Sequence, residues 1–178
     1  MTIKEWIFNR RLKRQEKQPV RFPNWERVRN IIVLYESDIM EKNPSIRRIV
    51  NELHEEGKDV TILGYVPRKD VSSANLPQSR VLGQKDFGWL GGLKQEVADD
   101  IRKRHYDLMI DLSIRNELAM KYIAMYLLAD FKVGRNFGEG IHNMLINLTP
   151  ASEDDPVAVQ EELYREIIRY LKMIKSND

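Results

Sequence analysis

The feature that most constrains the fold of this chain is a short apolar run that ends in polar residues, YDLMIDLS at positions 106–113. Its length and almost unbroken apolar character are typical of a strand buried inside a parallel sheet. Open α/β sheets bind their ligands outside the carboxyl ends of such strands. The run therefore predicts a parallel sheet, with Asp111 and Ser113 lying where a ligand would bind.

Strand-like and helix-like segments alternate along most of the chain. The segments expected to form strands are 30–35, 59–66, 80–82, 108–112, 131–133 and 143–148. Helices are expected from Pro44 to a cap at Gly57, after Gly92, over 116–129, and from Pro156 onward. Strands separated by such helices imply right-handed βαβ units. We therefore predict an α/β fold: a three-layer Rossmann-like domain with a mainly parallel sheet of five or six strands and helices on both faces. The strand order does not follow from the sequence.

The first residues depart from this alternation. Residues 2–17 predict a basic N-terminal helix, and the prolines at 19 and 23 predict an extended connector after it. The narrow apolar stripe expected on this helix consists of Ile3, Trp6 and Ile7, extended by Leu12. We therefore divide the chain into a basic helix and connector over 1–29 and a single Rossmann-like α/β domain over 30–178.

Positive charge is concentrated in the same N-terminal region. Residues 1–30 carry nine Lys or Arg against three Glu, a net charge of +6, whereas the whole chain has +2. The densest basic run consists of Arg10, Arg11, Lys13 and Arg14. It could contact nucleic acid or an anionic membrane surface, or the helix could dock on the domain or on a second subunit. We favour docking or plain solvation. The nearby aromatic residues lack the regular spacing of a base-stacking platform, which argues against nucleic acid.

Composition narrows the class of protein. A content of 42% hydrophobic and 31% charged residues is typical of a soluble globular protein. The chain has no Cys, which fits a reducing cytoplasm, and its three His are scattered, so we expect no metal site and no cofactor. The longest apolar run, 118–129, contains Lys121 and is shorter than the roughly 20 residues of a membrane span. The apolar residues near the start are interrupted by charges, which argues against a signal peptide.

The turn after the first expected strand, ESDIMEKN at 36–43, argues against a standard nucleotide site. A dinucleotide-binding turn needs glycines that let backbone amides approach a pyrophosphate, and this turn has none. Its acidic residues would also repel phosphate. The chain likewise lacks the Gly-rich phosphate loop that ends in Gly-Lys-Ser/Thr.

Polar side chains follow three of the expected strands and could converge on one crevice. The candidate catalytic bases are Asp38 and Asp111. The candidate ligand-binding residues, with the arginines as anion clamps, are Ser37, Ser113, Arg115, Asn116, Arg135 and Asn136. The alternative, which we favour, is that Asp111 and Ser113 satisfy backbone amides, that Asn116 is an N-cap, and that the arginines are solvated or paired locally. His142 has no identifiable partner in the sequence, so we interpret it as structural.

Two resemblances accompany these motifs. The string YDLMIDLS, an apolar helix and then ADFKVGR resemble the N-terminal domain of bacterial heptosyltransferases, glycosyltransferase family nine. That resemblance covers about 30 residues and implies a Rossmann-like half-fold; only Asp38 stands at a position comparable to the proposed catalytic Asp, and the glycines beside that residue are missing. The whole chain is also similar to an uncharacterised family of small bacterial proteins, known only as a domain of unknown function, which implies a fold and no activity.

Three functions stay open at this point. The first is a non-catalytic cytoplasmic α/β domain that binds a partner protein or a small ligand at the carboxyl ends of its strands. The second is a glycosyltransferase-like enzyme, or another enzyme acting on a sugar or phosphorylated metabolite, that uses the same crevice; it requires Asp38 and Asp111 within about 10 Å of each other. The third is a peripheral membrane protein attached through residues 1–17.

Overall fold

The computed structural model describes residues 1–36, 44–69, 78–138, 140–149 and 155–174. Within these residues, six strands form one sheet in the order β3-β2-β1-β4-β5-β6, and every neighbouring pair is parallel. The strands are β1 (Asn30–Glu36), β2 (Asp59–Tyr65), β3 (Ser79–Leu82), β4 (His105–Asp111), β5 (Leu128–Arg135) and β6 (Met144–Ile146). The predicted parallel α/β sheet is therefore confirmed.

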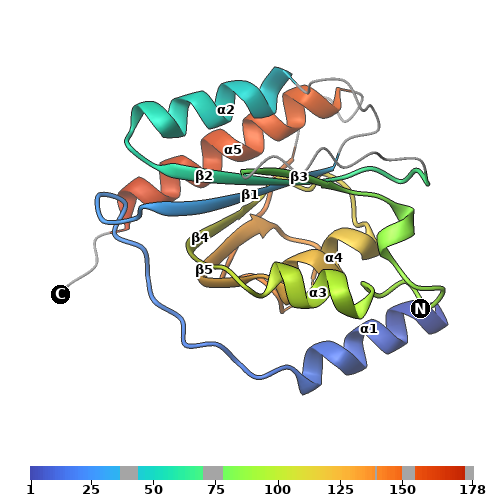
Figure 1. Ribbon diagram of the computed structural model, residues 1–178. Coiled ribbons are helices and arrows are strands. Elements are labelled where there is room, and N and C mark those ends of the chain that lie inside the picture. The colour runs from blue at the N-terminus through green and yellow to red at the C-terminus, as the bar shows by residue number, and fades with distance from the viewer. Residues whose placement is uncertain (37–43, 70–77, 139, 150–154, 175–178) are drawn as a thin grey trace.

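Helices cover both faces of this sheet, as predicted for a three-layer Rossmann-like fold (Figure 1). One face carries α2 (Pro44–Glu55) and α5 (Pro156–Met173), and the other carries α1 (Ile3–Arg14), α3 (Gln95–Ile101) and α4 (Leu118–Tyr126). Alternate residues of each strand point to opposite layers. Ile31 and Val33 of β1 pack with the first layer, whereas Ile32 and Leu34 pack with the second.

The strand order creates a switch point between β1 and β4. From β1 the chain proceeds outward through β2 and β3 and then returns to place β4 on the other side of β1. The connections therefore leave the carboxyl ends of β1 and β4 in opposite directions, and open α/β sheets usually bind their ligands at such a point. This edge of the sheet lies where the sequence predicted a ligand site.

The segment after β4 differs from the prediction. A helix was expected over 116–129, but α4 ends at Tyr126 and β5 already begins at Leu128. The apolar residues that suggested one long helix belong to two elements, because Leu127 has an extended backbone and Leu128 pairs with His105 on β4. Asn116 is not the N-cap that the alternative interpretation made it. Glu117 holds that position, and its side chain makes no capping hydrogen bond.

The buried side of α1 matches the predicted stripe only at Leu12. Phe8 is the residue that the helix buries, with its ring edge-on to Tyr122 of α4 at a centroid distance of 4.9 Å, and Leu12 packs beside it. Ile3 and Trp6 are exposed. The sequence suggested the wrong face because two apolar stripes compete on this short helix, and only contact with α4 decides between them. Among the described helices, none is both long and apolar enough to cross a bilayer.

Docking of α1 through one aromatic residue is testable. We expect Phe8→Ala to lower the free energy of unfolding by about 3 to 5 kcal/mol, the usual effect of removing a buried Phe side chain. The matched control is Trp6→Ala on the exposed face of the same helix, which should change it by no more than about 0.5 kcal/mol. Urea unfolding followed by circular dichroism measures both, and equal effects of the two substitutions would contradict the packing described.

Candidate functional site

Glu36 of β1, Asp111 of β4 and Gly134 of β5 lie on one face of the sheet at its carboxyl edge. Asp111 pairs with Leu34 of β1 on one side and with Gly134 of β5 on the other. Glu36 lies two residues beyond Leu34, so its side chain emerges on the same face. The alternating pattern places this row on the layer that also contains α3 and α4.

Asp111 is the centre of a buried hydrogen-bonded group. Its Oδ1 accepts from the backbone amide of Ser113 at 3.0 Å and from the Ser113 hydroxyl at 2.5 Å. Its Oδ2 lies 2.9 Å from Nε2 of His142, and the side chains of both residues are only 6% exposed. Asp111 therefore satisfies a backbone amide of the turn, as the favoured alternative expected. His142 was set aside for lack of a partner, and the fold supplies one from 31 positions earlier in the chain.

Gly134 makes room for this pair. A Cβ atom built there would lie 2.8 Å from His142 Nε2 and 3.0 Å from Asp111 Cβ. The first distance is shorter than real Cβ contacts allow and the second is tighter than most of them, so a side chain at this position would displace the imidazole. The packing of His142 against Asp111 therefore explains why a glycine stands in the Val-Gly-Arg motif.

Glu36 is the second buried carboxyl group of this edge, and the sequence analysis did not single it out. Its Oε1 accepts from the backbone amides of Ile114 at 3.0 Å and Arg115 at 2.7 Å. Its Oε2 is buried with no hydrogen-bond partner among the described residues, and the residue is 8% exposed. Burial raises the pKa of Glu36 from 4.5 to about 7, against the opposing effect of the two amides.

The other predicted residues take different places. Arg135 approaches the same turn, since its Nη1 donates to the carbonyl of Ile114 at 2.7 Å. Arg115 and Asn116 are exposed in the turn before α4. Asn136 bonds instead to Asn147, at 2.8 Å, and lies outside the group around Asp111. Ser37 and Asp38 lie outside the described residues, so the expected separation of the two aspartates is a prediction that stays open.

The order of the hydrogen bonds limits the chemistry. In a hydrolytic triad the His lies between the Ser and the Asp and takes the proton of the hydroxyl. Here Asp111 lies between Ser113 and His142, so the arrangement fixes the imidazole and does not activate the hydroxyl. No group of three or more His, Cys, Asp or Glu that could hold a metal ion occurs in the described part of the chain. The group is suited to hydrogen bonding and to proton exchange.

The raised pKa of Glu36 predicts a pH-dependent stability. Folding favours its protonated form, so this contribution is fully present below about pH 4.5 and is lost as the pH rises through about 7. Glu36→Gln mimics the protonated form, and its stability relative to the natural protein should increase by on the order of 2 to 3 kcal/mol between pH 5 and pH 8. Urea unfolding at both pH values measures the difference. Glu96→Gln, at an exposed position of α3, is the control, and identical pH profiles of the natural protein and Glu36→Gln would contradict the prediction.

Comparison with known proteins assigns the chain to a family. None of the curated proteins compared matches the sequence. A protein-family model matches residues 2–174, which include both the basic helix and the α/β fold, and its description is a family of unknown function, DUF6913. This confirms the resemblance to an uncharacterised family and gives no support to the one with heptosyltransferases. The chain belongs to the family of unknown function DUF6913.

Proposed function

We propose that this protein is a cytoplasmic α/β domain that binds a small polar ligand at the carboxyl ends of β1, β4 and β5. The observation that carries the proposal is the buried group of Ser113, Asp111 and His142 at the switch point of the sheet. Crevices at this point are the usual ligand sites of open α/β sheets. The absence of Cys from the sequence supports the location in a reducing compartment.

The burial of several ionisable side chains at this edge favours a binding role over a purely structural one. A strand can end in a single polar residue that caps the next turn. This edge holds two carboxyl groups and an imidazole within adjacent strands and turns, and buried ionisable groups of this kind are concentrated at functional sites. A ligand with hydroxyl or amide groups could exchange hydrogen bonds with them.

An enzyme that uses the same crevice is the alternative, and one observation favours it. The pKa of Glu36, raised to about 7, matches that of a general acid or base at neutral pH. A glycosyltransferase-like enzyme, or one acting on a sugar or phosphorylated metabolite, would need such a group. One substitution distinguishes the binding domain from the enzyme. Glu36→Gln should leave ligand affinity unchanged in a binding domain, whereas it should abolish turnover in an enzyme.

The binding proposal can be tested through the space that Gly134 provides. We expect Gly134→Ala to displace His142 and to abolish binding, because the new methyl group would lie only 2.8 Å from His142 Nε2. The probes are a panel of monosaccharides, sugar phosphates and small carboxylic acids. Their binding is detected by NMR, from the chemical shifts of the His142 ring and of the backbone amides of 113–115. The matched control is Gly140→Ala, where a Cβ atom meets nothing within 4 Å. Shifts that map elsewhere, or no shift with any probe, would overturn the proposal.

Attachment of α1 to a membrane surface is a second candidate, favoured by the outward face of that helix. With Phe8 turned inward, the opposite side presents Ile3, 76% exposed, and Trp6, with Arg10 stacked over the Trp6 ring at 5.4 Å. Trp89 is 85% exposed in a nearby turn, in which a Cβ atom on Gly91 would contact the Lys4 side chain. Exposed Trp beside Arg and Lys is suited to the interface of an anionic bilayer.

Sedimentation with liposomes tests this attachment. The natural protein should pellet with vesicles containing phosphatidylserine, less so at high salt, and not with phosphatidylcholine alone. The double variant Arg10→Glu with Arg14→Glu should stay in the supernatant, whereas Arg165→Glu on α5, across the sheet, should behave as the natural protein. Substitution is preferable to deletion of the helix, since deletion would also remove Phe8 from the core. Equal pelleting of all three proteins would contradict the candidate.

A further inference from the structure

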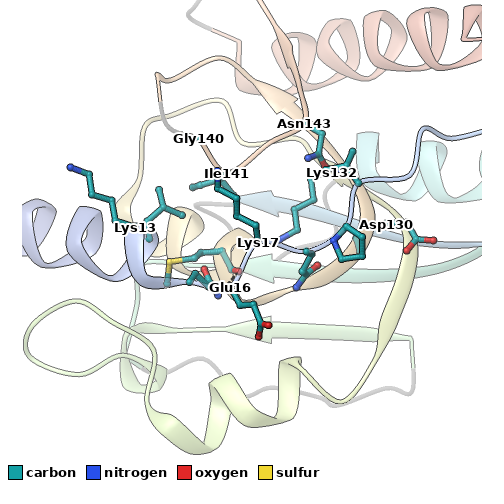
Figure 2. A pocket seen from close by; sticks show the side chains of 15 residues that line it. Lys13, Glu16, Lys17, Asp130, Lys132, Gly140, Ile141 and Asn143 are labelled. Atoms are coloured by element: carbon teal, nitrogen blue, oxygen red, sulfur yellow. Dashed lines mark hydrogen bonds between the residues drawn. The ribbon is translucent and has the colours of Figure 1, made fainter.

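A second candidate site is a cavity between the connector after α1 and the strand β5 (Figure 2). Its volume is about 420 Å³, within the range of small-molecule sites. Three stretches of chain enclose it: the end of α1 with the connector at 12–20, the residues from Met125 to Lys132, and the segment 140–143.

Lys132 is the buried charge of this cavity. It is 8% exposed and extends from β5 into the cavity in Figure 2. Its Nζ donates to the carbonyl of Ala124 at 2.8 Å, one of the carbonyls that the end of α4 leaves without a helical partner. An ammonium group has three donors, and no second acceptor occurs for this one among the described residues. Burial lowers the pKa of Lys132 from 10.5 to about 8, with no carboxylate opposing it.

The nearby acidic groups do not neutralise Lys132. Asp130 lies against His105, at 3.4 Å, and its carboxylate turns away from the cavity in Figure 2. Glu16 is exposed on the connector, where Lys13 and Lys17 are its neighbours at the rim. The surroundings of the buried amine therefore favour an added negative charge.

Gln18 supplies an independent observation at the same cavity. Its side-chain oxygen Oε1 is buried and has no hydrogen-bond partner among the described residues. Gln18 lines the cavity that Lys132 enters. A buried acceptor without a donor is unfavourable by about 1 to 3 kcal/mol. A rotation of the Gln18 side chain that brings Oε1 into the cavity would therefore be favoured by a ligand that donates a hydrogen bond to it.

We propose that this cavity binds a small oxyanion that also carries a hydroxyl group, with Lys132 holding the anionic oxygens and Gln18 accepting from the hydroxyl. Carboxylate and phosphate share this chemistry, and hydroxy acids and polyol phosphates are its two sources. The inference is separate from the crevice around Asp111, because it involves different residues and either site can fail alone.

The test uses four probes on the natural protein: glycolate and glycerol 3-phosphate, and acetate and propyl phosphate as counterparts without the hydroxyl group. NMR of lysine labelled with ¹³C at Cε follows Lys132 directly. A hydroxylated probe should raise the titration midpoint of Lys132 by roughly one pH unit, since a bound anion favours the charged amine. It should also bind roughly tenfold more tightly than its counterpart, the effect of one additional hydrogen bond.

Variants separate this site from general anion binding. Lys132→Met should abolish binding of the hydroxylated probes, measured by calorimetry. Lys58→Met should retain it, because it removes another buried lysine, which is bonded to the carbonyls of Trp25 and Val28 and does not line the cavity. The measurement on the natural protein decides the outcome even if Lys132→Met does not fold. An unmoved Lys132 resonance, or shifts confined to Lys13 and Lys17, would overturn the proposal, and equal affinities for glycolate and acetate would overturn the role of Gln18.

Discussion

The structure of the carboxyl edge depends on the need to satisfy two carboxyl groups that have been removed from water. Asp111 ends a strand held between two parallel neighbours, and Glu36 ends the strand beside it. A buried carboxylate without hydrogen bonds is strongly unfavourable, so the chain that follows must supply donors. Ser113 and the amides of Ile114 and Arg115 do so, and together they fix the turn between β4 and α4. The turn after β4 is therefore held in place by hydrogen bonds within the protein itself.

The fold could be predicted from the sequence because it rests on local patterns. Apolar runs of strand length, broken by Pro and Gly and separated by amphipathic helices, allow few arrangements other than a parallel sheet covered on both sides. Gly57 illustrates the point, since it has the left-handed backbone, with φ of 74°, that its predicted role after α2 requires. The order of the strands and the end of α4 at Tyr126 depend on which segments meet in space. These contacts leave no periodic mark on the chain.

The site could be predicted only in part, for the same reason. Asp111 and Ser113 were found because they end a recognisable strand. Glu36 follows the apolar run of β1 without interruption and resembles any polar residue at a strand end, while its distinguishing feature is its burial under the turn after β4. His142 precedes the short strand β6, and its partner lies on β4. Examining every polar residue that directly follows an expected parallel strand would identify Glu36. It would still miss His142, which comes before a strand.

The short segment 141–143 contributes both to the group around Asp111 and to the cavity that Lys132 lines. Ile141 and Asn143 line the cavity, whereas His142 between them turns to Asp111. Asn143 also fixes the segment to β5, because its side chain accepts from the Lys132 amide at 2.7 Å and its own amide donates to the Lys132 carbonyl at 2.8 Å. Ile141 lies in a turn and Asn143 in a bend, so the chain changes direction here before β6 begins at Met144. The hydrogen bonds between Asn143 and Lys132 therefore hold a segment that contributes both to the wall of the cavity and to the position of His142.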